Sequence, residues 1–177
     1  PVLVVRKERC EHRLGGAANA AANLAALGVE TELVGVIGRD EAGSRLCAML
    51  KEAGVEVAGL RFVDMTTPQK TRVLAGAFGT ARQQVLRLDE DPSEPLPRDT
   101  VDAVAKDLKE RARYADVVVV SDYGTGTVVE PIMATARRLA ADGAVVCVDS
   151  RYQLHSFRGV TVVTPNVPEA AALVGFA

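Results

Sequence analysis

Short apolar runs alternate with longer, partly polar stretches along most of the chain. The apolar runs have the length and the valine-rich character of buried parallel strands, and the longer stretches have the length of helices. The predicted strands are residues 2–6, 32–38, 117–120, 144–148 and 160–163, and residues 55–63 are expected to contain one or two short strands. The predicted helices are residues 15–27, 41–53, 99–114, 129–141 and 166–173. This alternation predicts an α/β protein in which βαβ units form a mostly parallel sheet.

Local signals refine the ends and the environment of these elements. Asp40 is a suitable N-cap for the helix that follows it, and Asp99 or Thr100 would cap the helix of residues 99–114. Residues 117–120 are four consecutive valines, which is typical of a strand that is buried on both faces of a parallel sheet.

Residues 69–89 interrupt the alternation, because two extended runs follow one another with no helix between them. This pattern predicts a β-hairpin whose turn falls in residues 77–82. The α/β core is then expected to comprise residues 14–63 and 99–177 of a single domain.

The stretch from Gly15 to Gly28 is an alanine-rich helix with distinctive ends. Gly28 suits the left-handed position that follows a helix, and the glycines at positions 15 and 16 let another group approach the backbone. Asn19 and Asn23 lie four residues apart and therefore share one helix face. Two interpretations stay open. The helix is either a packed one whose amides bond neighbouring backbone, or part of a polyol site in which Asn19 binds hydroxyls.

Polar residues stand directly after three of the predicted strands. They are Asp122, Asp149 and Asn166, and each precedes a helix. An N-cap role explains each of them singly. Ligands of open parallel sheets bind outside the carboxyl ends of the strands, so three such residues on one edge indicate a binding site.

Composition narrows the classes of function. The formal charge of −2 gives no basic excess for binding nucleic acid or an anionic membrane. Cys10, Cys47 and Cys147 form no CxxC pair, which indicates a reducing, cytoplasmic environment and argues against a thiolate metal site. No apolar run approaches the length of a membrane span, and no signal peptide is visible.

The residues after Gly15 resemble the first signature of the ribokinase-like (PfkB-type) carbohydrate kinases. The positions that satisfy its spacing are Gly15, Gly16, Ala17, Asn19, Ala21, Gly28 and Gly38. The resemblance implies a three-layer ribokinase-like fold, and sugar contacts from the two opening glycines and Asn19. It also implies a small β-lid formed by residues 2–6 and 69–89, through which family members often form homodimers.

A second run resembles the N-x-x-E motif of the same family. Asn166 and Glu169 match it, and the resemblance implies that they help to place Mg²⁺ and the phosphates of ATP. Glu169 would contact the metal, directly or through water, and Asp149 would lie on the same nucleotide side. A helix capping box explains Asn166 and Glu169 without any ligand.

Within that family the chain most resembles the kinase domains of the heptose 7-phosphate kinase/adenylyltransferases. The similarity rests on Arg13 and on residues 67–74, 83–89, 121–123 and 164–166. A substrate that already carries a phosphate needs cations, which Lys70 and Arg72 would supply from the lid. Alternatively, Lys70 and Arg72 are ordinary solvent-exposed charges on the lid. Gln84 and Asp122 would contact the sugar.

The chain departs from that pattern in several places. Thr125 replaces a usual lysine, Ser150 and Arg151 replace a Pro-Lys pair, and the loop of residues 76–82 is longer. The family's Gly-Ala-Gly-Asp motif, which supplies the catalytic base, does not occur in these 177 residues. We therefore assign no catalytic residue, expect a domain truncated at both ends, and expect the chain alone to be inactive.

The sequence thus predicts part of an ATP-dependent kinase that converts D-glycero-D-manno-heptose 7-phosphate to the 1,7-bisphosphate. One alternative is a kinase for another sugar, such as ribose or fructose. Another is a non-catalytic sugar- or nucleotide-binding module. A dinucleotide-binding oxidoreductase has little support, because Gly124 and Gly126 are not followed by a third glycine at the required spacing.

Overall fold

The computed structural model describes residue 4 and residues 6–76 and 82–175. The helices are α1 (Gly16–Ala26), α2 (Glu41–Glu52), α3 (Arg98–Arg111), α4 (Glu130–Ala141) and α5 (Val167–Val174), with one-turn 3-10 helices η1 (Ala112–Tyr114) and η2 (Leu154–Ser156). The strands are β1 (Gly35–Gly38), β2 (Leu60–Val63), β3 (Gln69–Ala75), β4 (Gln83–Glu90), β5 (Val117–Asp122), β6 (Val145–Ser150) and β7 (Val162–Val163).

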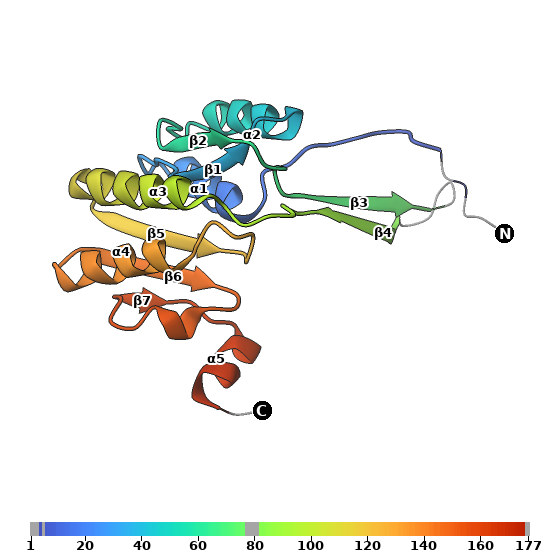
Figure 1. Cartoon of the computed structure of the whole chain (residues 1–177). Helices are drawn as coiled ribbons and strands as arrows, with labels where there is room; N and C mark the ends of the chain where they lie inside the picture. Colours follow the sequence, from blue (N-terminus) through green and yellow to red (C-terminus); the bar gives the residue numbers. More distant parts are fainter. Residues whose placement is uncertain (1–3, 5, 77–81, 176–177) are drawn as a thin grey trace.

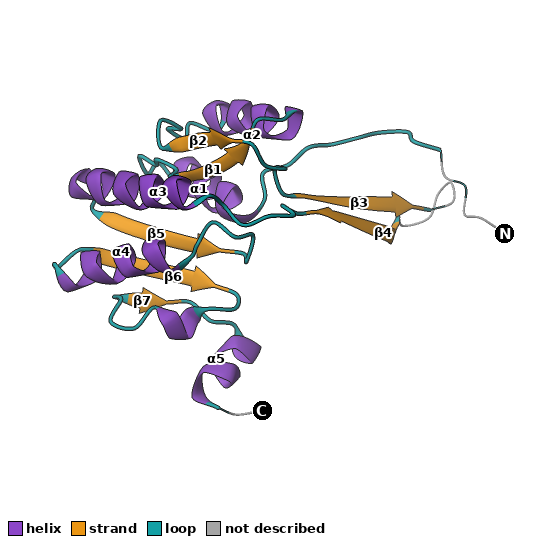
Figure 2. Ribbon diagram, viewed as in Figure 1, coloured by secondary structure: helices purple, strands orange, loops and turns teal. Residues whose placement is uncertain are grey.

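Parallel pairing organises the body of the molecule. β1 pairs with β2, and β5, β6 and β7 pair in that order, all in parallel. Their carboxyl ends face the same side of the molecule (Figure 1). β3 and β4 instead form an antiparallel hairpin that projects beyond this carboxyl edge (Figure 2). The predicted α/β class and the predicted hairpin are therefore confirmed. Its turn, residues 77–81, lies outside the described residues.

Apolar side chains form three clusters that hold the helices against the strands. One packs α4 and η2 against β5 and β6, around the fully buried Val146 and Ala136. A second packs α1 against α2, around Leu50, and includes Leu60 of β2. The third joins α3 and α4 to Val34 and Val36 beside and within β1. Helices thus lie on both sides of the β1–β2 pair, which gives the expected three layers.

The predicted burial of residues 117–120 on both faces is wrong. Val118 and Val120 are buried against α4, whereas Val117 and Val119 are each 48% exposed. The alternation follows from the two-residue period of a strand, because α4 covers only one face of β5 in the part of the chain that is described. A continuous valine run carries no information about which face is covered.

Several predicted boundaries also change. Within residues 55–63, where one or two short strands are predicted, the structure has β2 at Leu60–Val63 and an isolated parallel bridge between Glu56 and Glu32. Between these two pairings the chain passes close to the residues that precede β1. A Cβ on Gly59 would lie 2.8 Å from the Leu33 carbonyl oxygen. The strand predicted at 160–163 shortens to Val162–Val163. The N-cap of α3 is Pro97 rather than Asp99 or Thr100.

The lid strand predicted at residues 2–6 falls mostly outside the described residues. Val4 and Arg6, which are described, have no strand geometry. No helix among the residues placed by the structure is long and apolar enough to cross a membrane.

Candidate functional site

The start of α1 meets the carboxyl end of β5, and the two opening glycines differ in what surrounds them. Gly15 is exposed with φ −130°, and a Cβ there would have no atom within 4 Å. Gly16 has φ +53°, and its Cβ would lie 3.4 Å from the ring of Tyr123. Gly15 therefore leaves open space at the carboxyl edge, while Gly16 gives room to an aromatic ring. Nothing in the sequence pattern predicted that the Tyr123 ring would pack against Gly16.

The side chains of Asn19 and Asn23, both on α1, differ in their hydrogen bonding. The Asn23 amide nitrogen donates to the Asn19 carbonyl oxygen at 2.9 Å, as expected for a helix amide that bonds its own backbone. The Asn19 side chain is exposed and makes no hydrogen bond within the described residues. Asn23 is thus accounted for by the helix, and Asn19 presents its amide one turn into α1, near Gly15.

Asp122 ends β5 and is only 4% exposed. One carboxylate oxygen accepts from the Gly124 backbone N–H at 2.9 Å, and the other accepts from the Ser150 hydroxyl at 2.7 Å. Ser150, at the end of β6, is fully buried and also accepts from the Gln153 N–H at 3.1 Å. The Asp122 carboxylate therefore links the turn after β5 to the end of β6 through these hydrogen bonds. Ser150, a departure from the resembled pattern, supplies a hydroxyl that proline lacks.

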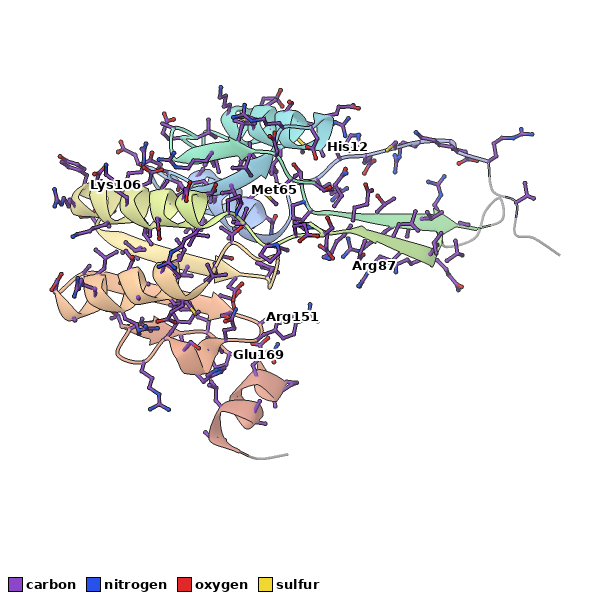
Figure 3. All side chains as sticks on the ribbon, in the orientation of Figure 1. His12, Met65, Arg87, Lys106, Arg151 and Glu169 are labelled. Atoms are coloured by element: carbon purple, nitrogen blue, oxygen red, sulfur yellow. The ribbon has the colours of Figure 1, made fainter. Side chains whose placement is uncertain are left out.

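Those turns present a second tyrosine and an arginine at the same edge. Tyr152 lies so close to Gly124 that a Cβ there would be 2.9 Å from the ring, and Gly124 has φ +72°. The Arg151 guanidinium lies 5.6 Å from the centre of the Tyr152 ring, within the range of a cation–π contact. Figure 3 shows Arg151 projecting from the carboxyl edge, where Glu169 also lies.

The residues of the N-x-x-E run form a complete capping box at the start of α5. The Asn166 N–H donates to a Glu169 carboxylate oxygen, and the Glu169 N–H donates to the Asn166 side-chain oxygen, both at 2.9 Å. Asp149 accepts from the Thr164 hydroxyl at 3.5 Å. Among the described residues, no group of three or more acidic, histidine or cysteine side chains could hold a metal ion. The donors available here are oxygens, which suit a cation that keeps most of its water.

Charged side chains gather on one face of the hairpin. Lys70 pairs across the strands with Asp89, with its ammonium nitrogen 3.2 Å from that carboxylate and 3.7 Å from Asp91. Arg87 donates two hydrogen bonds to Asp89, at 2.9 and 2.8 Å. The Arg87 hydrogen bonds are the main reason that the pKa of Asp89 lies below its ordinary value, with a smaller contribution from Lys70.

Arg72 lies directly opposite Arg87 on the same face. Two like charges in facing positions disfavour the hairpin, unless an anion lies between them. Gln84 is exposed and faces Leu74 beyond a register shift. Lys70, Arg72 and Gln84 thus lie on the projecting hairpin, whereas the other predicted site residues lie at the carboxyl edge.

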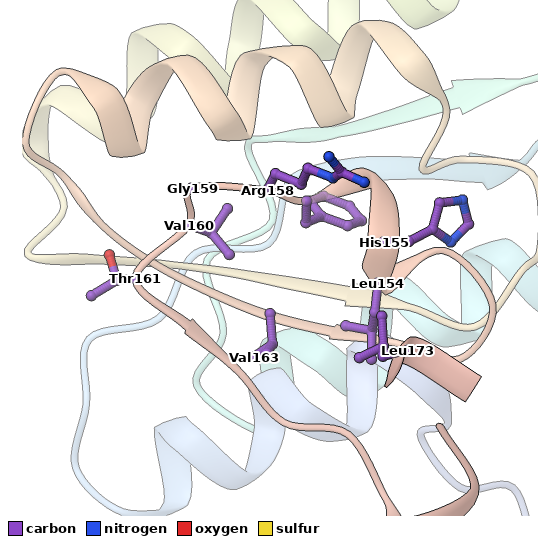
Figure 4. A pocket seen from close by; sticks show the side chains of 9 residues that line it. Leu154, His155, Arg158, Gly159, Val160, Thr161, Val163 and Leu173 are labelled. Atoms are coloured by element: carbon purple, nitrogen blue, oxygen red, sulfur yellow. The ribbon is translucent and has the colours of Figure 1, made fainter. Parts of the chain in front are cut away.

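Two hollows on the described surface lie away from the predicted site residues. The first, of about 390 Å³, lies between η2, β7 and α5 and is bordered by Leu154, Val163 and Leu173 (Figure 4). The second, of about 820 Å³, lies at the base of the hairpin beside β2 and α3. At the carboxyl edge itself, Gly15 and Asn19 are both exposed.

Comparisons with known proteins show to which family the chain is similar. The D-beta-D-heptose 7-phosphate kinase of Bordetella bronchiseptica is 42% identical over 180 residues, covering 99% of this chain and 54% of that protein. The bifunctional protein HldE of Shewanella amazonensis is 39% identical over 178 residues, covering 99% of this chain and 35% of that protein. The chain therefore spans about a third to a half of the length of these relatives.

Solved structures show the same fold at low sequence identity. Phosphofructokinase-2 from Escherichia coli in complex with fructose-6-phosphate superposes with a TM-score of 0.71 at 22% identity, covering 99% of this chain and 58% of that one. Arabidopsis thaliana ribokinase complexed with ribose and ATP gives 0.61 at 20% identity, covering 89% and 50%. The family profile described as pfkB family carbohydrate kinase matches residues 1–177. The chain belongs to the pfkB family of carbohydrate kinases.

Proposed function

We propose that this chain is the sugar-holding part of an ATP-dependent kinase that phosphorylates D-glycero-D-manno-heptose 7-phosphate to the 1,7-bisphosphate, in ADP-heptose synthesis. The support from relatives is that both curated proteins named above cover nearly the whole chain, and one is named for heptose 7-phosphate. The observation that carries the proposal is the exposed amide of Asn19 beside the open backbone of Gly15.

The sugar would lie at the start of α1. Gly15 leaves space for a ligand to approach the backbone, Gly16 places the Tyr123 ring beside it, and Asn19 offers both a donor and an acceptor to hydroxyls. Asp122 would contribute mainly by fixing the turn that carries Tyr123, since both of its oxygens already accept hydrogen bonds. This arrangement supports the polyol interpretation of the opening helix over simple packing.

The phosphate already present on the substrate would be bound by the hairpin. Lys70, Arg72 and Arg87 share one face, and Asp89 offsets part of their charge. Facing arginines suit a dianionic phosphate, because guanidinium groups donate in a planar fork to its oxygens. Gln84, farther along the hairpin, would contact sugar hydroxyls.

The nucleotide would bind near the start of α5, with Asn166, Glu169 and Asp149 around its phosphates. The Glu169 oxygen outside the capping box would hold a water of a bound Mg²⁺, which neutralises phosphate charge when it is present. The protein groups described here bind and orient the substrates. No residue in the chain is assigned as the base that removes the hydroxyl proton, so we propose that these 177 residues alone do not turn over ATP.

The hairpin would also mediate a cytoplasmic homodimer. Its face opposite the charges carries Leu86 and Leu88, which are 49% and 50% exposed. A two-stranded hairpin is marginally stable by itself in water. A second copy that covers this face would stabilise the hairpin and shield its strand edges.

Calorimetric titration of the purified chain tests the substrate assignment. Heptose 7-phosphate should bind at least tenfold more tightly than ribose, fructose or fructose 6-phosphate. Tighter binding of ribose or fructose would instead identify a kinase for another sugar. Binding of ATP together with no detectable binding of any of these sugars would instead identify a nucleotide-binding module. In a coupled assay, sugar-dependent ADP formation by these 177 residues would refute the proposed lack of turnover.

A further inference from the structure

Three segments that are far apart in sequence meet at the base of the hairpin. They are the end of β1 at Gly38, the start of α2 at Asp40 and Gly43, and Thr67, which precedes β3. Thr67 is only 3% exposed. Met65, just before it, lies at this base in Figure 3. The hairpin is therefore joined to the α/β body through one buried residue of the chain that leads into it.

Asp40 and Thr67 form a closed set of hydrogen bonds there. The Thr67 N–H and hydroxyl donate to the two Asp40 carboxylate oxygens, at 2.8 and 2.7 Å. The same hydroxyl accepts from the Gly38 N–H at 2.9 Å, and Asp40 also accepts from the Gly43 N–H at 2.7 Å. Only the last of these bonds is needed to cap α2. The others connect the hairpin to the end of β1.

Two glycines allow this junction to be so compact. A Cβ on Gly38 would lie 2.3 Å from the Met65 carbonyl oxygen and 2.7 Å from the Thr67 hydroxyl. A Cβ on Gly43 would lie 2.2 Å from the Gly38 carbonyl oxygen. Real Cβ atoms do not approach so closely, so the backbone contact itself requires glycine at both positions. Gly38 thus serves the junction rather than a ligand.

The chain that leaves the hairpin is held differently. Residues 92–97 line the hollow of about 820 Å³ at the hairpin base. Most of them are exposed, and Pro92 and Leu96 are half-buried. The two connections of the hairpin are therefore unequal, with one fixed at Thr67 and the other lying on the surface.

We propose that Asp40 and Thr67 are positioning residues, which fix the orientation of the β3–β4 hairpin relative to the carboxyl edge without touching substrate. The proposal rests on the proposed function only in that the hairpin acts as a lid over the sugar. Without the Thr67 hydroxyl, the hairpin keeps its own ladder of hydrogen bonds but loses its fixed direction.

Distances between spin labels test this directly. The three native cysteines are first replaced by serine, and pairs of new cysteines are introduced to carry the labels. The distance between labels at positions 83 and 106 then measures the position of the hairpin relative to α3. The distance between labels at positions 106 and 142 involves only α3 and the end of α4, so it measures the packing of the α/β body without the hairpin. Thr67→Val should at least double the width of the first distance distribution and leave the second unchanged. Asp40→Ser, which keeps a helix cap but cannot reach Thr67, should do the same.

Matched variants give the controls. Thr67→Ser keeps the hydroxyl and should restore the narrow distribution, and Thr71→Val removes an exposed hydroxyl of β3 and should change nothing. An unchanged hairpin distribution in Thr67→Val would overturn the proposal. Equal broadening of the body distribution would overturn it as well, because it would show a general loss of packing.

A kinetic measurement adds the functional consequence. In the complete kinase that carries this chain, Thr67→Val should raise KM for the sugar at least fivefold and leave KM for ATP within twofold. An equal rise in both would contradict a role in positioning the lid. If the complete protein shows no kinase activity, the proposed function fails, while the distance measurement still decides the role of the junction.

Discussion

Replacing Ser150 by alanine tests the link that holds the carboxyl edge together. Ser150 is fully buried, and its hydroxyl donates at 2.7 Å to Asp122, whose side chain is almost completely buried. A hydrogen bond to a charged partner contributes about 1.5–3 kcal/mol, and its loss leaves a buried carboxylate oxygen without that donor. The Gln153 N–H loses an acceptor at the same time. We expect Ser150→Ala to lower the free energy of unfolding by about 2–3 kcal/mol.

Equilibrium unfolding in urea, followed by circular dichroism, measures this change. A loss of that size corresponds to a fall in Tm of about 5–10 °C for a domain of this length. Ser93→Ala removes an exposed hydroxyl and should stay within about 0.5 kcal/mol of the unchanged chain. If Ser150→Ala also stays within about 0.5 kcal/mol, then the Asp122–Ser150 hydrogen bond does not hold the two turns, and our account of this edge is wrong.

Three further predictions concern single residues. Gly16→Ala should destabilise the chain by about 1–2 kcal/mol in the same assay, because φ is +53° there, whereas Gly15→Ala should be nearly neutral for stability. Arg72→Gln should weaken binding of heptose 7-phosphate at least tenfold in calorimetry without changing binding of the unphosphorylated heptose. Partial burial raises the pKa of Asp40, but hydrogen bonds from Thr67 and Gly43 outweigh it and leave the pKa below its ordinary value. The resulting stability is complete above the unfolded pKa and is lost as the pH falls below about 4, so urea midpoints of Asp40→Asn should depend less on pH in that range.

Local patterns predicted the elements well because the causes are local. The Asp40 cap, the left-handed Gly28 with φ +85°, and the hairpin between two helical regions all follow from neighbouring residues. The capping box of Asn166 and Glu169 was also visible as a motif. Sequence spacing alone could not separate this structural role from phosphate binding, because both roles use the same two side chains.

The contacts that organise the edge could not be predicted in the same way. Thr67 and Asp40 lie 27 residues apart, and Asp122 and Ser150 lie 28 apart, so no periodic pattern links them. The approach of Tyr123 to Gly16 joins the first helix to β5. Two indirect signals were present in the sequence: Asp122 stood at the end of a predicted strand, and Ser150 departed from the resembled family pattern. The structure explains both through the hydrogen bond between these two residues.

Calorimetry on two asparagine variants tests the central claim most directly. Asn19→Ala and Asn23→Ala remove the same group from the same exposed helix face, four residues apart. Within the described residues only the Asn23 side chain bonds the helix backbone, so Asn23→Ala is the variant that should disturb the helix more, and it controls for such a disturbance. If the start of α1 holds the sugar, Asn19→Ala should weaken binding of heptose 7-phosphate at least tenfold, and Asn23→Ala less than twofold. Equal affinities for the two variants would contradict the placement of the sugar at this helix.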